Sequence, residues 1–259
     1  MSLPRILSQT WKTAGLPLRA EALRAAWARL NPALTLRLYD DAASRAVIAE
    51  VSPEHMTAYD AMPFGVMRAD VFRLAVLLRD GGIYADIDMQ PLRPLPQDLF
   101  ARPCSVSIEA HLGRQRQREL GYRRGIQIAN CILAAEPGHP FLRAALDRAF
   151  ALFDAAPAVT RDRIEDITGP RMLTRLLQDR VWPDVWVGSQ IQLMAPLDYP
   201  NVWPVNRHMV ARHETHGSWK AADLAPGSLR RRWIERNRPV NPFAAPVWSP
   251  AAAVWGQGG

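Results

Sequence analysis

The 259-residue sequence contains no apolar run that approaches the ~20 residues of a membrane-spanning helix. Its beginning, MSLPRILSQTWK, lacks the continuous hydrophobic region of a secretory signal. Only two cysteines occur, Cys104 and Cys131, and their spacing fits no metal-binding motif. These absences predict a cytoplasmic protein in which both thiols are free, because a reducing compartment disfavours a disulfide.

Signals for several ligand classes are also missing. The sequence has no P-loop, no internal repeat and no recognised nucleic-acid-binding motif, so nucleic acid is not an expected partner. What it does have is a basic excess, with 32 Lys and Arg against 25 Asp and Glu and a net charge of +7. This excess either favours acidic partners, such as nucleotide diphosphates, acidic glycans or anionic lipid, or reflects solvated arginine-rich faces alone.

The most informative segment is residues 68–94, RADVFRLAVLLRDGGIYADIDMQPLRP. Its first part, residues 68–79, is almost continuously apolar, which predicts a buried helix. The two polar exceptions, Asp70 and Arg73, lie three residues apart and therefore share one face of that helix. The pair Gly81-Gly82 then predicts the end of the helix, because glycine tolerates the left-handed cap conformation.

Residues 83–88 alternate as a strand does, so Tyr84, Asp86 and Asp88 are predicted to face one side. At about 3.3 Å per residue, the two carboxylates lie roughly 6 to 7 Å apart. Paired carboxylates in a partly buried place need compensation, and their hard oxygens suit Mg²⁺ or Mn²⁺. The plainer interpretation is a solvated strand end with two unrelated acids. The ordered combination of buried helix, glycine pair and acidic strand favours a site.

This segment resembles the core of the retaining glycosyltransferases that contain the D-x-D sugar-binding motif. That family includes yeast Golgi initiating mannosyltransferases and bacterial polysaccharide and lipo-oligosaccharide transferases, and its pattern is close to S-D-x-x-R-x-x-x-L-x-x-x-G-G-x-Y-x-D-x-D. The chain departs at the first position, where Ala69 replaces serine. The positions that match are Asp70, Arg73, Leu77, Gly81, Gly82, Tyr84, Asp86 and Asp88.

The opening residues 4–12, PRILSQTWK, predict a first strand and resemble the family's I-P-x-I-I-H-Q-T-W-K, with Ser8 where histidine is common. The resemblance implies that this strand ends beside the nucleotide base, with Gln9 and Trp11 at the donor. This agrees with the rule that open α/β sheets bind ligands beyond the carboxyl ends of their strands. A core or hinge position for Trp11 is the alternative.

Two later segments extend the resemblance. Residues 126–133 predict a strand in which Asn130 occupies a position where the family commonly has asparagine. His213, Ser218 and Trp219 fit the family's H-x-x-x-x-S-W. A lone histidine is more often structural than a metal ligand, but the resemblance implies that His213 binds the metal. Neutral imidazole suits Mn²⁺ better than Mg²⁺.

The predicted order of elements is typical of an α/β fold. Residues 19–30 predict a helix and residues 34–39 a strand, and Asp40 or Asp41 either caps the next helix, which is the favoured interpretation, or approaches the donor ribose. Together these elements indicate a parallel βαβ unit. The resemblance implies the GT-A fold, a Rossmann-like α/β/α sandwich. We assign residues 1–225 to this catalytic domain and residues 226–259 to a basic C-terminal extension and tail.

Two arginine-rich stretches leave alternatives open. Residues 111–125 form either a mobile substrate loop or an exposed helical insertion. Residues 228–238 interleave arginines with Trp233 and either lie on anionic membrane or form a surface helix. From Pro246 onward we expect a loose tail.

The resemblance implies a metal-dependent retaining glycosyltransferase that moves a hexose from a UDP- or GDP-sugar donor to a glycan or lipid-linked acceptor. Asp86 and Asp88 are the expected catalytic residues, and Asp86, Asp88 and His213 the expected ligands of Mn²⁺ or Mg²⁺. The expected donor-binding residues are Gln9, Trp11, Asp70, Arg73, Tyr84, Asp86, Asn130, Ser218 and Trp219.

A further expectation is peripheral contact with the anionic inner face of a membrane. Two alternatives to the transferase stay open: a non-catalytic glycan- or membrane-surface-binding protein on a degenerate fold, and metal-dependent phosphoryl transfer that uses the aspartates.

Overall fold

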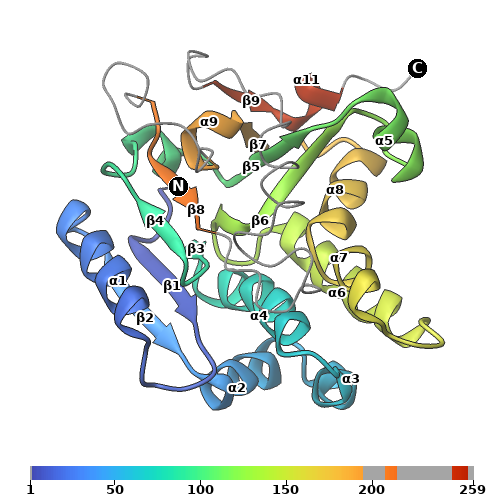
Figure 1. Cartoon of the computed structure of the whole chain (residues 1–259), viewed down its shortest axis with the longest axis horizontal. Coiled ribbons are helices and arrows are strands. Elements are labelled where there is room, and N and C mark those ends of the chain that lie inside the picture. Colours follow the sequence, from blue (N-terminus) through green and yellow to red (C-terminus); the bar gives the residue numbers. More distant parts are fainter. Residues whose placement is uncertain (1, 195–207, 215–246, 256–259) are drawn as a thin grey trace, which may run out of the picture.

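The computed structural model describes residues 2–194, 208–214 and 247–255 of the chain. A central mixed sheet carries helices on both of its faces (Figure 1). The strand order in this sheet is β2-β1-β3-β6-β5-β7-β9. In chain order its strands are β1 (Ile6–Thr10), β2 (Thr35–Tyr39), β3 (Gly82–Ala85), β5 (Cys104–His111), β6 (Ile126–Ala135), β7 (Val185–Gly188) and β9 (Trp248–Pro250). A second, two-stranded sheet joins β4 (Met89–Pro91) to β8 (Ala211–His213).

The first part of the sheet confirms the predicted parallel βαβ unit. β1 pairs in parallel with β2 on one side and with β3 on the other. β6 runs antiparallel to both β3 and β5, and only its residues from Ile132 to Ala135 lie opposite β3. The earlier part of β6, from Ile126 onward, therefore extends past the carboxyl end of β3, where ligands bind in open α/β sheets.

Helices α4, α6 and α8 cover one face of the sheet together with α2, whereas α1 and the β4–β8 sheet cover the other. The helices are α1 (Leu18–Leu30), α2 (Asp41–Val51), α3 (Met56–Ala61), α4 (Gly65–Asp80), α5 (Arg114–Glu119), α6 (Pro140–Asp154), α7 (Ile164–Ile167), α8 (Pro170–Asp179), α9 (Gln190–Leu193) and α11 (Ala251–Trp255). Short 3-10 turns lie at Pro53–His55, Gln97–Ala101 and Arg161–Arg163.

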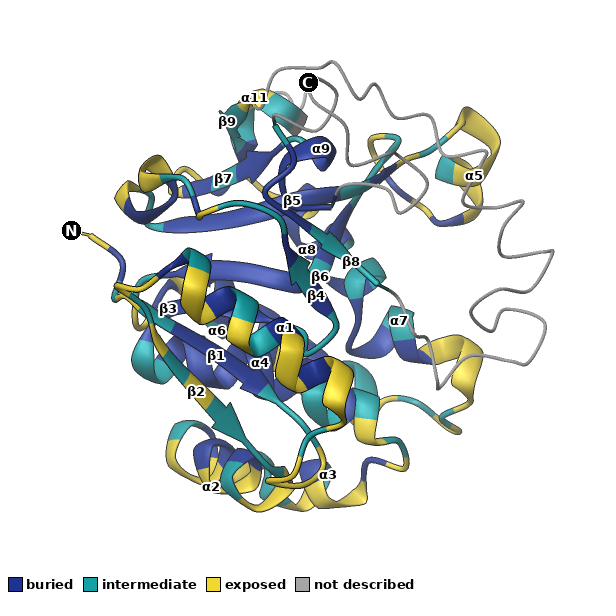
Figure 2. Ribbon diagram, turned by 60° about the vertical axis from the view of Figure 1, so that its left-hand side comes forward, coloured by how far each residue is buried: buried dark blue, intermediate teal, exposed yellow. Residues whose placement is uncertain are grey.

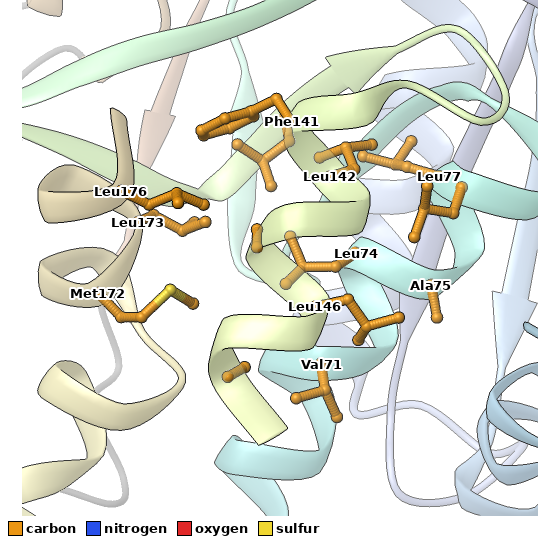
Figure 3. Packing of buried hydrophobic residues seen from close by; sticks show 14 of the residues in the cluster. Val71, Leu74, Ala75, Leu77, Phe141, Leu142, Leu146, Met172, Leu173 and Leu176 are labelled. Carbon is orange, nitrogen blue, oxygen red and sulfur yellow. The ribbon is translucent and has the colours of Figure 1, made fainter. Parts of the chain in front are cut away.

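Helix α4 lies at the centre of the larger hydrophobic core, as its apolar sequence predicts. Val71, Leu74 and Leu77 are fully buried, and Figure 3 shows them facing α6, with α8 packed on the far side of α6. Each such side chain contributes about 1.5 to 3 kcal/mol through burial. This packing fixes the position of the helix, and with it the position of Asp70 and Arg73.

The predicted glycine stop is confirmed and has two physical causes. Gly81 follows α4 with φ 66°, and Gly82 begins β3 with φ 88°, a backbone region that favours glycine. A Cβ on Gly81 would lie 2.6 Å from the side chain of Pro137, and a Cβ on Gly82 would lie 2.6 Å from the backbone oxygen of Ile6. The turn from α4 into β3 therefore needs glycine at both positions.

Several smaller predictions can be compared directly. The side chain of Asp40, one of the two predicted cap candidates, accepts a hydrogen bond from Ala43 N (2.8 Å) and caps α2. Cys104 and Cys131 are free and buried. Part of residues 111–125 forms the exposed helix α5, as one of the two alternatives had it (Figure 2). In the part of the chain that the structure describes, no helix has the length and apolar character needed to cross a bilayer.

The prediction of a loose tail from Pro246 is wrong for residues 247–255. β9 joins the sheet by pairing antiparallel with β7, and Ala251 is completely buried. The Trp248 ring lies against Gly188, where a Cβ would come within 2.9 Å of it. The boundary assigned at residue 225 and the arginine-rich stretch 228–238 lie outside the described residues.

Candidate functional site

The two aspartates of the acidic motif lie on a turn and not on a strand, which corrects the sequence prediction. β3 ends at Ala85, and Asp86 N then donates a hydrogen bond to Cys131 O (2.8 Å). Met89 N donates to Asp86 O (3.0 Å), which closes a tight turn through Asp88 before β4 begins. The turn brings the two carboxylates closer than the 6 to 7 Å estimated from an extended strand.

His213 reaches these carboxylates because β8 pairs with β4. Met89 lies opposite His213 in the antiparallel ladder, and Glu214 N donates to Asp88 O (3.0 Å). His213 Nε2 lies 3.0 Å from Asp88 Oδ1 and 4.0 Å from Asp86 Oδ2. One ligand atom from each of the three side chains lies within 4.8 Å of the others.

The donor set of these three side chains fits a divalent cation. Two carboxylates and one imidazole are hard or borderline ligands that suit Mn²⁺ and Mg²⁺ sites in proteins. Their side chains are 23% (Asp86), 17% (Asp88) and 20% (His213) exposed, so the site keeps a side open to water or substrate. Three protein ligands with further positions left for substrate oxygens are typical of a catalytic metal centre and not of a structural one.

Charges in the site shift the pKa values of its groups. Burial raises the pKa of Asp86; the neighbouring Arg73 opposes this effect, and the charge of Asp88 adds to it. Burial is the largest single effect on the pKa of His213 and would lower it, but the hydrogen bond to Asp88 and the charges of Asp88, Asp86 and Glu109 together outweigh burial, so the net direction is upward. Both shifts describe a site with concentrated negative charge, which a cation would offset.

Two buried side chains restrain one oxygen of the Asp86 carboxylate. Tyr84 Oη donates a hydrogen bond to Asp86 Oδ1 (2.7 Å). The guanidinium of Arg73 lies 3.3 Å from the same oxygen and 3.0 Å from Asp70 Oδ1. Both Tyr84 and Arg73 are almost fully buried. Their contacts fix the Asp86 carboxylate and leave its other oxygen directed toward His213.

Asp70 anchors this arrangement to two distant segments. Its Oδ1 accepts a hydrogen bond from Asn130 Nδ2 (2.9 Å), and its Oδ2 accepts one from Thr168 Oγ1 (2.8 Å). Burial raises the pKa of Asp70 to about 6, although Arg73 and these donors favour the charged form. The structure therefore brings together buried Asp70, buried Arg73 and half-buried Asn130, three of the residues predicted to bind the donor, next to Asp86.

Strand β1 also contributes residues next to the site. Gln9 is fully buried, and its Nε2 donates to Asp86 O (3.3 Å) while its Oε1 accepts from Arg24 (2.9 Å). Trp11 follows the carboxyl end of β1 and is partly exposed. Ser218 and Trp219, the remaining predicted donor-site residues, lie outside the described residues.

Sequence reasoning missed residues that complete the site. Thr168 lies just before helix α8, and its hydroxyl donates a hydrogen bond to Asp70, 98 positions away in the sequence. Trp27 is fully buried and donates from Nε1 to Met89 O (3.0 Å), which fixes α1 to the strand after the acidic turn. The sequence around Thr168 indicates no contact with Asp70. The helical pattern of residues 19–30 places Trp27 on a face with other apolar residues but does not indicate its bond to Met89.

Comparisons with known proteins agree with this geometry. Residues 17–106 match the family described as "Glycosyltransferase sugar-binding region containing DXD motif". The chain is 31% identical over 195 residues to the initiation-specific alpha-1,6-mannosyltransferase of Schizosaccharomyces pombe, covering 68% of this chain and 48% of the relative. It is 30% identical to inositol phosphoceramide mannosyltransferase 3 of the same yeast, covering 72% and 50%. It is 28% identical to the putative glycosyltransferase HOC1 of Saccharomyces cerevisiae, covering 57% and 39%.

The chain spans half the length or less of these curated relatives. Among solved structures, the PaToxG glycosyltransferase superposes with a TM-score of 0.51 at 17% identity, covering 69% of this chain and 70% of that one. This likeness supports the fold, and together with the central mixed sheet it confirms the predicted α/β GT-A class.

Proposed function

We propose that this chain, whose residues 17–106 match the DXD-containing glycosyltransferase sugar-binding region, transfers a hexosyl group from a nucleotide-sugar donor to a hydroxyl of a glycan or lipid-linked acceptor. The observation that carries the proposal is the convergence of Asp86, Asp88 and His213 within 4.8 Å at the carboxyl end of β3. This is the edge where an α/β sheet binds nucleotides, and the three side chains form a donor set for a divalent cation.

In this proposal the three side chains hold Mn²⁺ or Mg²⁺ against the donor diphosphate. When bound, the cation supplies positive charge that offsets the charge developing on the leaving nucleotide. The chain's own residues fix the geometry. Tyr84 and Arg73 restrain the Asp86 carboxylate, and the β4–β8 ladder restrains His213 against Asp88. Such restraint keeps the charge arrangement from reorganising during the reaction.

We further propose that the donor carries mannose and that the reaction retains anomeric configuration. The relatives named mannosyltransferases support a mannosyl donor. The name of the inositol phosphoceramide relative supports a lipid-linked acceptor, and the chain's net charge of +7 suits an anionic surface. Retention rests on the resemblance to retaining transferases, and the described residues suggest no separate catalytic base.

Donor turnover with controlled metal content tests the proposal. Purified protein is incubated with GDP-mannose or UDP-glucose, in excess chelator and after addition of Mn²⁺ or Mg²⁺. We expect hydrolysis or transfer with metal and none with chelator. Binding of a nucleotide sugar without any turnover would instead favour the non-catalytic binding protein. Undiminished turnover in excess chelator would reject the metal assignment.

A further inference from the structure

Glu109 lies on β5 beyond the end of β3, on the part of the sheet that extends past the acidic turn. Ile108 faces the core under α6 and α8, while the irregular pairing around Glu109 turns its carboxylate toward Gln127 of β6. Glu109 is half-buried. Partial burial removes water from this charged carboxylate, which costs free energy unless hydrogen bonds or a ligand compensate for it.

Only one oxygen of this carboxylate is engaged within the described chain. Gln127 Nε2 donates to Glu109 Oε2 (2.8 Å), and Tyr122 Oη donates to Gln127 Oε1 (3.0 Å). These two hydrogen bonds, from Tyr122 to Gln127 and from Gln127 to Glu109, fix the orientation of the Glu109 carboxylate. Among the residues that the structure describes, Glu109 Oε1 has no hydrogen-bond partner.

A second unsatisfied acceptor lies close to the first. Gln190, at the start of α9, is 4% exposed, and its Nε2 donates to the backbone oxygen of Glu109. Its own Oε1 is buried and has no hydrogen-bond partner among the described residues. An unpaired buried acceptor costs about 1 to 3 kcal/mol, so Glu109 and Gln190 together present acceptor oxygens for which the described residues supply no donors.

These acceptors share one side of the sheet with the candidate metal centre. Met194, directly after α9, contacts Cys131 (Sδ to Sγ, 3.3 Å), and Cys131 O in turn holds Asp86 N. Gln127 and Cys131 are separated along β6 by roughly 13 Å at about 3.3 Å per residue. The charge of Glu109 also contributes to the raised pKa values of His213 and Cys131, as expected for a group near the same site.

The chemistry of this cluster selects its ligand. It offers hydrogen-bond acceptors and a negative charge, so it repels phosphate and suits a neutral group that donates several hydrogen bonds. We propose that Glu109, with Gln190, is a sugar-binding subsite that accepts hydrogen bonds from hexose hydroxyls. The inference rests on the proposed function and deepens it, because it separates a sugar side of the site from the diphosphate side at Asp86, Asp88 and His213.

The test compares nucleotide with nucleotide sugar. Calorimetric titrations with Mn²⁺ measure the affinity of wild type, Glu109→Gln and Glu109→Ala for GDP, GDP-mannose, UDP and UDP-glucose. Glu119→Gln, on the exposed helix α5 of the same hairpin, is the matched control. We expect both Glu109 variants to lose about 10- to 100-fold in affinity for the nucleotide sugar, the range for a hydrogen bond to a charged group. Their affinity for GDP or UDP alone should match wild type.

A transfer assay with methyl α-mannoside as acceptor separates the two sources of hydroxyls. Unchanged donor affinity with a tenfold higher KM for methyl α-mannoside supports the subsite and assigns it to the acceptor sugar. Equal losses for nucleotide and nucleotide sugar would overturn the inference in favour of a structural role, and so would no change in either assay. If wild type binds neither nucleotide sugar, the proposed function fails, and this inference fails with it.

Discussion

His213 Nε2 lies 3.0 Å from Asp88 Oδ1, although 125 positions separate the two residues in the sequence. The contact depends on a three-residue strand on each side, because β4 follows the acidic turn directly and β8 ends at His213. A short ladder of this kind is held by few hydrogen bonds. The candidate metal centre therefore combines residues from the edge of the sheet with a residue from a late segment of the chain.

Replacing His213 by alanine should weaken metal dependence and turnover together. The variant keeps the β4–β8 backbone ladder but removes one of the three ligands, so we expect the Mn²⁺ concentration for half-maximal activity to rise about tenfold or more, equivalent to at least about 1.4 kcal/mol. Metal titrations of donor turnover measure this shift. His216→Ala tests the register assigned to H-x-x-x-x-S-W. A silent His213→Ala beside a damaging His216→Ala would show that register to be wrong.

Asp88→Ala should abolish turnover without loss of folding. Asp88 carries one of the concentrated negative charges of the site, and its removal relieves repulsion with Asp86. We expect the melting temperature in metal-free buffer to stay equal to that of wild type or to rise, while Mn²⁺ no longer stabilises the protein. Thermal melts with and without Mn²⁺ give both values. A strongly destabilised metal-free variant would contradict the assignment of Asp88 to the metal.

The elements nearest the site could be predicted because their signals are local. The apolar run of α4, the Gly81-Gly82 stop and the Asp40 cap each depend on residues within a turn or two of one another. The end of β3 could not be predicted. Alternation continues through Asp88, but the ladder stops at Ala85, and only the tertiary bonds of Asp86 reveal the turn.

Elsewhere, contacts between segments that are distant in the sequence limit what the sequence can predict. Nothing local to Thr168 indicates that its hydroxyl meets Asp70. The segment 248–250 is short and lies beside prolines, so its sequence alone predicts an irregular tail and not a strand. It becomes a strand because Gly188 of β7 leaves room for the Trp248 ring. In both cases the contacting residue is determined by the assembled tertiary structure and not by neighbours in the sequence.

Arg73→Met should chiefly destabilise the protein. The Arg73 side chain is 4% exposed and lies between Asp70 and Asp86, so its removal leaves the buried Asp70 and the half-buried Asp86 without their cation. We expect the free energy of unfolding to fall by roughly 3 to 5 kcal/mol, measured by denaturant titration. Arg79→Met, near the end of the same helix, is the control, because Arg79 is 28% exposed and one of its ion-pair partners, Glu50, is exposed, so its loss should cost less stability than the loss of Arg73.

Donor titrations on the folded fraction of Arg73→Met distinguish the two roles of this residue. Weaker nucleotide-sugar binding with little change in the free energy of unfolding would mean that Arg73 contacts the donor directly, as the family resemblance implied. A large loss of stability with retained affinity would mean that Arg73 acts only by positioning Asp86.

Asp70 should make the free energy of unfolding depend on pH in the direction opposite to that of a carboxylate whose pKa is lowered by folding. Its pKa rises from 3.8 to about 6 in the fold, because burial disfavours the charged form. Between about pH 4 and 6 the native state therefore binds more protons than the unfolded chain, and the free energy of unfolding falls as pH rises. A shift of about two units corresponds to about 3 kcal/mol lost across this window.

Comparing wild type with Asp70→Asn isolates that effect, since asparagine has nearly the same shape but does not titrate. Other carboxylates, such as Asp80 with its lowered pKa, contribute equally to both proteins and cancel in the difference. Denaturant titrations from pH 4 to pH 7 should show wild type losing stability relative to Asp70→Asn as pH rises. A difference that does not change with pH would mean that Asp70 keeps its ordinary pKa. A difference that grows in favour of wild type would mean that attraction to Arg73 outweighs burial.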